Sequence, residues 1–158
     1  MKETTLSENF ISIVGQNLAD CNLTLLLSQI NWNYRNIEIV KLIKTGLNDL
    51  QLNQLLNFLV RSKVHTLMLS YNNLTELSLD ALLHFVSINS TLKNIYLPKN
   101  NISLLKGNAR PKIHLLKQKG INLYIWVSKT TFFIFYFQFT LLFMIFFHSD
   151  FIFLDIVD

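Results

Sequence analysis

The chain is poor in cysteine and glycine, and both shortages exclude kinds of site. Its single cysteine, Cys21, excludes an internal disulfide and a cysteine-rich metal site. Only four glycines occur, and the sequence has no glycine-rich phosphate loop, HExxH metal motif or nucleophile elbow. Glu76 and Asp80 lie near an expected helix start, where negative charge complements the helix dipole. We therefore expect no catalytic residue, cofactor or metal ion, and predict that the protein is not an enzyme.

Acidic residues are missing from Lys93 to Lys129, a stretch that carries eight of the 14 Lys and Arg residues. A basic stretch of this kind is able to meet nucleic acid or anionic lipid. It contains no recognised nucleic-acid motif, however, and its charges are spread over expected loop, helix and strand. We interpret it as the solvated end of a domain and predict no specific nucleic-acid partner.

The first ten residues, MKETTLSENF, lack a basic segment followed by an apolar run, so they do not form a secretory signal. Four Asn-x-Ser/Thr sequons occur, at Asn22, Asn73, Asn89 and Asn101. Without a signal they are better explained by the asparagine-rich composition than by glycosylation. We predict a cytoplasmic protein.

Phenylalanine is scarce in most of the chain, since ten of the 13 lie between Phe132 and Phe153. This separates an expected domain at 1–129 from a hydrophobic tail at 130–158. The apolar run at 131–147 favours a membrane anchor, with basic residues ahead of it and acids behind. A helix of that length spans only about 25 Å of a roughly 30 Å bilayer core. Two other interpretations stay open: a non-native end from a shifted reading frame in AT-rich DNA, and a packed cap over the end of the domain.

A paired asparagine occurs twice in similar surroundings, in LSYNNLTEL (69–77) and again in LPKNNISLL (97–105). Both belong to a frame of the form apolar-x-x-apolar-x-apolar-x-x-Asn-x-apolar, followed by a stretch with helical spacing. The frame recurs at a nearly constant interval over 8–128 and ends with the strand of a fifth unit. Gln16, Thr45 and Ser128 stand at the Asn position in the weaker copies. The best copies are Ile37, Val40, Leu42, Thr45 and Leu47; Val64, Leu67, Leu69, Asn72 and Leu74; and Leu92, Ile95, Leu97, Asn100 and Ile102.

These residues resemble the leucine-rich repeat family, specifically its ribonuclease-inhibitor-like class with repeats of about 27–29 residues. The resemblance covers roughly three quarters of the chain and implies an α/β solenoid, with parallel strands on a concave face and helices on a convex face. A strand–helix unit cannot bury its own apolar face, so stacked neighbours must bury it. In the fourth repeat, Gly107 and Pro111 predict a helix that starts late, near Pro111.

The resemblance also assigns roles to single residues. The residues inside each strand motif should form a column on the concave face: Ser12, Lys41, Met68, Tyr96 and Tyr124. Aromatic side chains beside cations are typical of protein-binding hot spots. We predict a partner-binding set of Lys41, Met68, Tyr71, Tyr96, Lys99, Tyr124 and Trp126. Asn72 and Asn100 should turn inward and bond the backbone of adjacent loops as a ladder, while Asn73 and Asn101 stay exposed.

The expected function is that of a scaffold that binds a protein partner of unknown identity through the concave face. The alternative is a membrane-anchored adaptor or structural protein held by the hydrophobic tail. The short repeats and an amino-acid composition typical of AT-rich genomes also resemble those of proteins from intracellular bacteria, some of which act on host cells. Delivery to a host cell is therefore a further hypothesis beside the cytoplasmic location.

Overall fold

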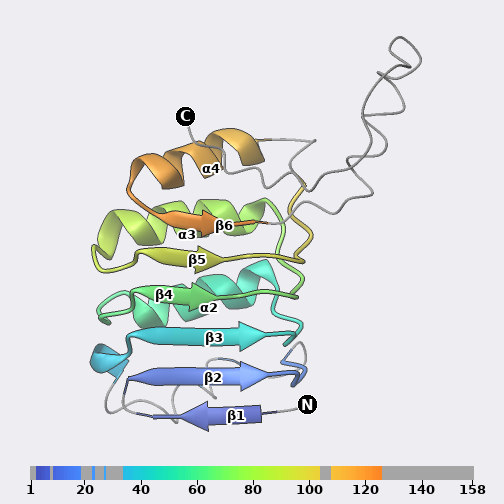
Figure 1. Ribbon diagram of the computed structural model, residues 1–158, viewed down its shortest axis with the longest axis vertical. Coiled ribbons are helices and arrows are strands. Elements are labelled where there is room, and N and C mark those ends of the chain that lie inside the picture. Colours follow the sequence, from blue (N-terminus) through green and yellow to red (C-terminus); the bar gives the residue numbers. More distant parts are fainter. Residues whose placement is uncertain are drawn as a thin grey trace, which may run out of the picture. The chain divides into compact units, whose positions relative to one another are not determined.

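Six strands form one sheet in chain order (Figure 1). The structure is a computed structural model that describes residues 3–7, 9–18, 23, 27, 34–103 and 108–125, all within the compact unit Met1–Val127. The strands are β1 (Glu3–Leu6), β2 (Phe10–Val14), β3 (Ile39–Ile43), β4 (Thr66–Met68), β5 (Asn94–Tyr96) and β6 (Asn122–Tyr124). The predicted tail, 130–158, lies outside the described residues, so its three interpretations stay predictions.

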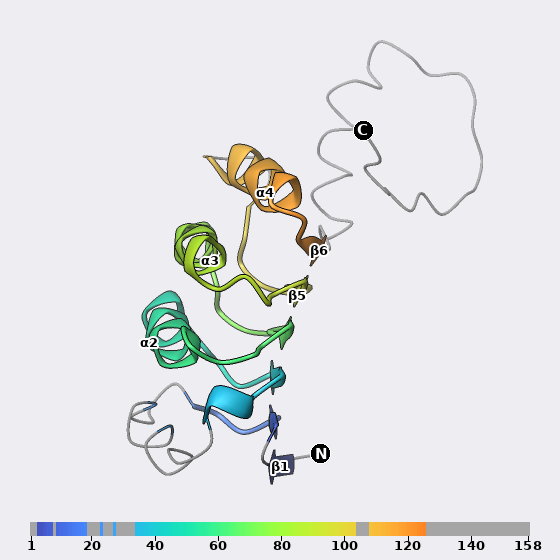
Figure 2. The same cartoon turned by 90° about the vertical axis from the view of Figure 1, so that its left-hand side faces the viewer.

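The helices lie on one face of this sheet, as Figure 2 shows from the side. They are α2 (Asp49–Leu59), α3 (Leu77–Ile88) and α4 (Ala109–Gln118), and a short 3-10 turn, η1 (Tyr34–Asn36), precedes β3. Each of β3, β4 and β5 is followed by one helix, and α3 packs between α2 and α4. The predicted mixed α/β class is confirmed. No helix of the described residues covers the other face, which we call the open strand face.

The strand register reproduces the repeat spacing read from the sequence. Ile11 pairs with Val40, Val40 with Leu67, Leu67 with Ile95, and Ile95 with Leu123. All four pairs are parallel, and each joins residues that hold the same frame position in consecutive units. Equivalent frame positions are therefore direct neighbours across the sheet.

The frame positions form the core between the sheet and the helices. The apolar positions of the two central copies expose at most 1% of their surface: Ile37, Val40, Leu42, Leu47, Val64, Leu67, Leu69 and Leu74. Helix α3 adds Leu79 and Leu82, both fully buried, as its apolar spacing predicts. On the same helix Leu77 is 67% exposed. The position of each leucine in the helical repeat, rather than its residue type, decides its burial.

Strand β1 differs from the predicted all-parallel sheet. It runs antiparallel to β2, with Glu3 opposite Val14 and Leu6 opposite Ile11. A tight connection allows this, in which the backbone N–H of Ser7 donates to the carbonyl of Phe10 at 2.9 Å. The strand lies ahead of the repeat frame, so the repeat spacing gave no sign of it.

Helix α2 starts with a side-chain cap, whereas helix α4 has a proline in its first turn. Asn48 and Gln51 form a capping box on α2, each side chain accepting a hydrogen bond from the other residue's backbone N–H. Helix α4 starts at Ala109, so the predicted start near Pro111 is late by two residues. Pro111 is tolerated in the first turn because backbone N–H groups there have no intrahelical acceptor. Ala109, the first residue of the helix, is fully buried.

Candidate binding surface

The register places the predicted central column in one row across β2–β6. Ser12 pairs with Lys41, Lys41 with Met68, Met68 with Tyr96, and Tyr96 with Tyr124. The predicted neighbour relations are therefore confirmed, whereas a binding role for the row stays a prediction. Ser12 is only 2% exposed, contrary to its expected place on the surface. Its short hydroxymethyl group lies between the longer side chains of the adjacent strands.

Two tyrosines stack at one end of this row. The ring centroids of Tyr96 and Tyr124 are 4.3 Å apart and their planes differ by 3°. Tyr124 is 44% exposed and Tyr96 is half-buried. Equivalent positions on neighbouring strands are close enough for such pairing. The pair offers a rigid aromatic surface with polar tips, a combination suited to an interface.

Burial raises the pKa of Tyr96 above its ordinary value of 10.0. The neighbouring Tyr124 raises this pKa further, through a hydrogen bond to its hydroxyl and through repulsion between two phenolates. The folded state therefore holds the Tyr96 proton more tightly than the unfolded state does. Its contribution to stability is complete below pH 10 and is lost as the pH rises through the raised pKa. At neutral pH the Tyr96 hydroxyl is therefore protonated and hydrogen-bonded to Tyr124.

The turns after β2–β5 share a left-handed residue at the same place. The φ angles are +70° at Gly15, +56° at Lys44, +59° at Tyr71 and +60° at Lys99. Backbone hydrogen bonds join consecutive turns. The N–H of Lys44 donates to the Ser70 carbonyl at 3.0 Å, and the N–H of Tyr71 donates to the Pro98 carbonyl at 2.9 Å. The side chains of Lys44, Tyr71 and Lys99 are all exposed and form a row beside the strand ends.

Replacing Lys44 with glycine is expected to raise the free energy of unfolding by about 1 kcal/mol, because glycine adopts a positive φ without the clash that a Cβ causes. Urea denaturation of the full-length protein measures the change. Lys44→Ala is the matched control, since it removes the same charge but keeps the Cβ. An equal gain in both variants would show that charge, not backbone strain, is responsible.

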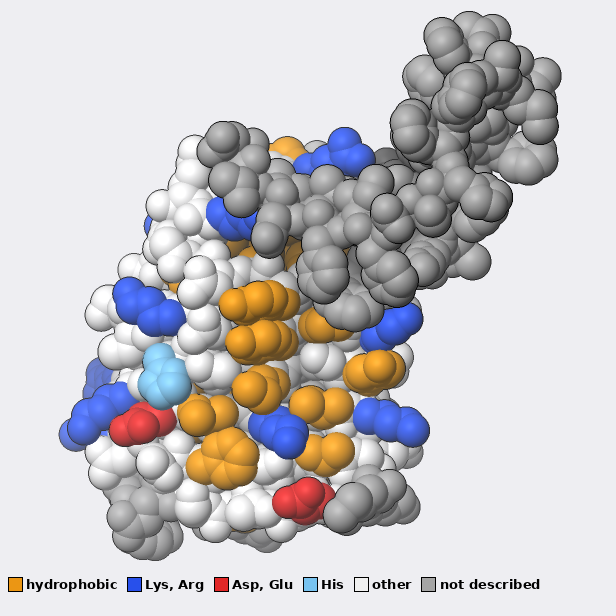
Figure 3. Space-filling model, in the orientation of Figure 1, with side chains coloured by type: hydrophobic (Ala, Val, Ile, Leu, Met, Phe, Trp, Pro, Cys, Tyr) orange, Lys and Arg blue, Asp and Glu red, His pale blue; other side chains and the backbone are white. Residues whose placement is uncertain are grey.

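Apolar side chains flank the central row on the open strand face. Phe10 pairs with Ile39 at the strand starts, and Val14 pairs with Ile43 at the strand ends. All four are partly exposed. Figure 3 shows hydrophobic side chains gathered over the strands, with Lys and Arg side chains among them and along both borders. Lys41 is therefore an ammonium group placed among aliphatic neighbours.

The side chains of Asn72 and Asn100 bond backbone groups of adjacent turns. Asn72 Oδ1 accepts from the backbone N–H of Thr45 and Leu47 at 2.9 and 3.1 Å, and from the Thr45 hydroxyl at 3.0 Å. Its Nδ2 donates to three carbonyls, the shortest being that of Leu42 at 2.7 Å. Asn100 repeats the pattern with three bonds, two of them to the preceding loop. These amides stabilise the turns and are not available to a ligand.

The outer copies of the ladder position behave differently. Gln16 Nε2 donates to Thr4 Oγ1 at 2.6 Å, so its amide bonds the added strand β1. Ser128 lies outside the described residues. Asn73 and Asn101 are exposed, as predicted.

A second buried asparagine was missed from the sequence. Asn89, which follows α3, donates to the carbonyls of Ser62 and Val60 at 3.0 and 3.5 Å. Its Oδ1 accepts from the backbone N–H of Thr91 and Leu92 at 3.0 and 3.2 Å. The available signal was that Ser62 and Asn89 each precede a strand, at equivalent places in consecutive repeats. Repeats are thus bonded at both ends of their strands.

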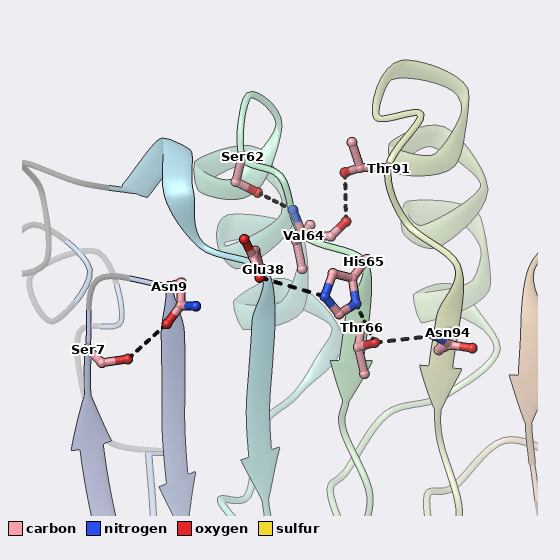
Figure 4. Close-up of polar contacts among 9 residues, drawn as sticks. All are labelled: Ser7, Asn9, Glu38, Ser62, Val64, His65, Thr66, Thr91 and Asn94. Atoms are coloured by element: carbon pink, nitrogen blue, oxygen red, sulfur yellow. Dashed lines mark hydrogen bonds and ion pairs between the residues drawn. The ribbon is translucent and has the colours of Figure 1, made fainter.

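Polar side chains also connect the strand starts (Figure 4). His65 Nδ1 lies 2.9 Å from Thr66 Oγ1, and His65 Nε2 lies 4.0 Å from Glu38 Oε2. Asn94 donates to the same Thr66 hydroxyl at 3.3 Å, and Asn122 donates to Asn94 Oδ1 at 3.0 Å. Thr66 is buried, and its hydroxyl contacts His65 of its own segment and Asn94 of the next strand, so it joins β4 to β5.

The acidic residues near the α3 start have specific partners rather than only the predicted dipole role. Glu76 Oε1 accepts from the backbone N–H of Ser103 at 3.1 Å. Asp80 pairs with Lys112 of the next helix at 2.6 Å. The carboxylate of Asp49, in α2, accepts hydrogen bonds from the backbone N–H and the hydroxyl of Thr75. Carboxylates therefore connect successive repeats.

Three further points concern Trp126, metal ligands and membrane-spanning helices. Trp126 of the predicted partner-binding set lies outside the described residues. Within the described ranges, no group of three or more His, Cys, Asp or Glu is arranged to hold a metal ion. The helices among these residues are too short or too polar to cross a membrane.

Comparisons with known proteins bear on the fold. No family model matches the chain, and no curated protein gives a significant match. The solved structure of Leiomodin-1 Actin-Binding Site 2 (ABS2) is similar, with a TM-score of 0.54 over 79% of this chain and 76% of that chain. The fold is leucine-rich-repeat-like. Sequence identity to that structure is 18%, so the likeness concerns the fold alone.

Proposed function

We propose that the protein is a scaffold that binds a protein partner through the open strand face. The observation that carries the proposal is the partly exposed row Met68–Tyr96–Tyr124. Its two tyrosines stack, and each of its strands is hydrogen-bonded to a neighbouring strand. Aromatic side chains held rigidly lose little entropy on binding and dominate many interfaces. The hydrogen-bonded asparagines lie in the turns, so variation on the face leaves the fold intact.

We further propose that the units are ribonuclease-inhibitor-like repeats that form a solenoid with this face on its concave side. Support comes from the repeat-length steps between paired strands and from the asparagine amides of Asn72 and Asn100, which bond adjacent turns. The structural neighbour is an actin-binding site, which agrees with a protein-interaction role in general. A likeness in fold does not transfer its partner, and actin is not proposed here.

Replacing both Tyr96 and Tyr124 with alanine is expected to abolish partner capture without unfolding the protein. Each truncated hot-spot residue typically weakens binding by about 2 kcal/mol or more, so the pair should reduce affinity by more than about a hundredfold. The full-length protein and the variant are used as bait, and captured proteins are compared by quantitative mass spectrometry.

The matched control is Leu77→Ala with Leu115→Ala, which removes two exposed apolar side chains from helices α3 and α4. Proteins retained by this control but lost by the tyrosine variant are the specific partners. Far-ultraviolet circular dichroism verifies that both variants remain folded. Identical captured sets for all three proteins would contradict the proposal.

The membrane-anchored alternative rests on the sequence of 131–147 and its charged flanks. It is tested by vesicle flotation of the full chain beside a version that ends at Lys129. Flotation of the full chain alone supports an anchor, and equal behaviour of both argues against it. The cytoplasmic location and delivery to a host cell likewise stay predictions.

A further inference from the structure

Three lysines lie on or beside the open strand face, one within a strand and two in the turns that follow strands. Lys41 lies at the centre of β3, and Lys44 lies in the left-handed turn that follows it. Lys99 occupies the equivalent turn after β5. Adjacent strands are about 4.8 Å apart, so Lys44 and Lys99 are separated by about 10 Å across the sheet. Tyr71 lies between them in the same row.

These lysines have no acidic partner within the part of the chain that the structure describes. The acidic side chains there contact other groups: Glu3 with Thr5, Glu38 with His65, Asp49 with Thr75, Glu76 with Ser103 and Asp80 with Lys112. Among the described acids, Glu3 lies opposite Val14 on β1, and Glu38 directly precedes β3 and pairs with His65. Lys41 is two strands away from β1, across Ser12. Among the described residues, no carboxylate therefore pairs with these three lysines.

The surroundings of Lys41 make a charged partner favourable. Its side chain is half-buried, with Ile39 and Ile43 on the same face of its strand and Met68 beside it. Aliphatic neighbours remove part of the hydration of an ammonium group without supplying an acceptor. A carboxylate brought by a partner would supply that acceptor as a charge-assisted hydrogen bond.

Resting on the proposed function, we propose that the partner presents an acidic, apolar polypeptide segment that lies across the strands. Its apolar side chains contact Met68 and the stacked tyrosines, and its carboxylates contact Lys41, Lys44 and Lys99. Carboxylates about 10 Å apart are seven residues apart on a helix. On an extended strand, residues two and four apart share a face and lie about 7 and 14 Å apart, which brackets this distance within the reach of flexible lysine side chains. A nucleic acid fits less well, since a duplex carries one charge per about 1.7 Å and this face has three cations among aliphatic groups.

The probes are fluorescent amphipathic peptides with a Leu and Phe face and two glutamates, spaced about seven apart in a helical version and about two or four apart in extended versions, so that both glutamates share one face. Matched peptides carry glutamine at both positions. At least one glutamate peptide should bind the full-length protein about tenfold more tightly than its glutamine partner, and the difference should shrink with added salt. The charge-reversed variant Lys44→Glu with Lys99→Glu should lose this preference.

Lys63→Glu with Lys93→Glu is the control, because these exposed lysines precede β4 and β5, at the opposite ends of the strands, and give the same change in net charge. This control should retain the preference for glutamate. Equal losses in both variants, equal binding of glutamate and glutamine peptides, or binding of neither would overturn the proposal. So would displacement of the peptide by a 20-base-pair DNA duplex or anionic lipid vesicles with higher affinity.

Failure here is distinguishable from failure of the proposed function. If glutamate gives no advantage but Tyr96→Ala with Tyr124→Ala still loses captured proteins, the face binds a partner that is not acidic. If the tyrosine variant captures the same proteins as the unaltered chain, the face itself is not the binding surface.

Discussion

Asn72→Ala is expected to lower the free energy of unfolding by about 3 kcal/mol, because each buried polar group left without a partner costs about 1–3 kcal/mol. The side-chain amide makes six hydrogen bonds to two consecutive turns. Alanine leaves the N–H groups of Thr45 and Leu47 and the carbonyl of Leu42 without this partner. Water cannot replace it easily, since Asn72 is 5% exposed.

Urea denaturation of the full-length protein measures this loss, with Asn73→Ala as control. Asn73 is the adjacent asparagine, is exposed, and has one side-chain bond, to the Gly46 carbonyl at 3.3 Å. Its replacement should change stability by less than about 0.5 kcal/mol. Equal effects of the two substitutions would refute the assigned ladder role.

Leu82→Ala is expected to destabilise the protein by about 3 kcal/mol, within the range for creating a cavity in a well-packed core. Leu82 is fully buried on α3, the helix that packs between α2 and α4. Its neighbours belong to rigid repeats on both sides and have little freedom to collapse into the space.

The same substitution at Leu77 provides the comparison, since this leucine belongs to the same helix and is 67% exposed. Its replacement should change stability by less than about 0.5 kcal/mol. Thermal or urea unfolding of both variants measures the two losses of stability. A larger loss at Leu77 than at Leu82 would mean that α3 presents a different side to the sheet.

The pairing of strands was predictable because the same short sequence frame recurs in each repeat and equivalent frame positions pair. A parallel neighbour places equivalent residues side by side, so the spacing of Val40, Leu67 and Ile95 in the chain is also their register in the sheet. The central row followed from the same alignment, since a period of two sends alternate side chains to opposite faces. The inward turn of Asn72 followed from the resemblance to leucine-rich repeats.

Other features depended on information outside the frame. Strand β1 precedes the first repeat and runs in the opposite direction, so no periodicity signalled it. The left-handed turns contain Lys44, Tyr71 and Lys99, residue types that do not by themselves indicate a positive φ. Asn89 bonds a neighbouring repeat from a position after a helix, which the strand frame does not include. The stacking of Tyr96 on Tyr124 required side-chain positions that spacing alone does not supply.

The reversed direction of β1 determines how this array is lengthened by design. A parallel unit cannot be added ahead of β2 without displacing β1, because both would need the same backbone edge. An internal unit such as residues 64–91 has no such restriction. It meets a parallel strand on each side and carries its own Asn72 and Asn89. Duplicating that segment would extend the open strand face by one unit while leaving the pairing of β1 with β2 unchanged.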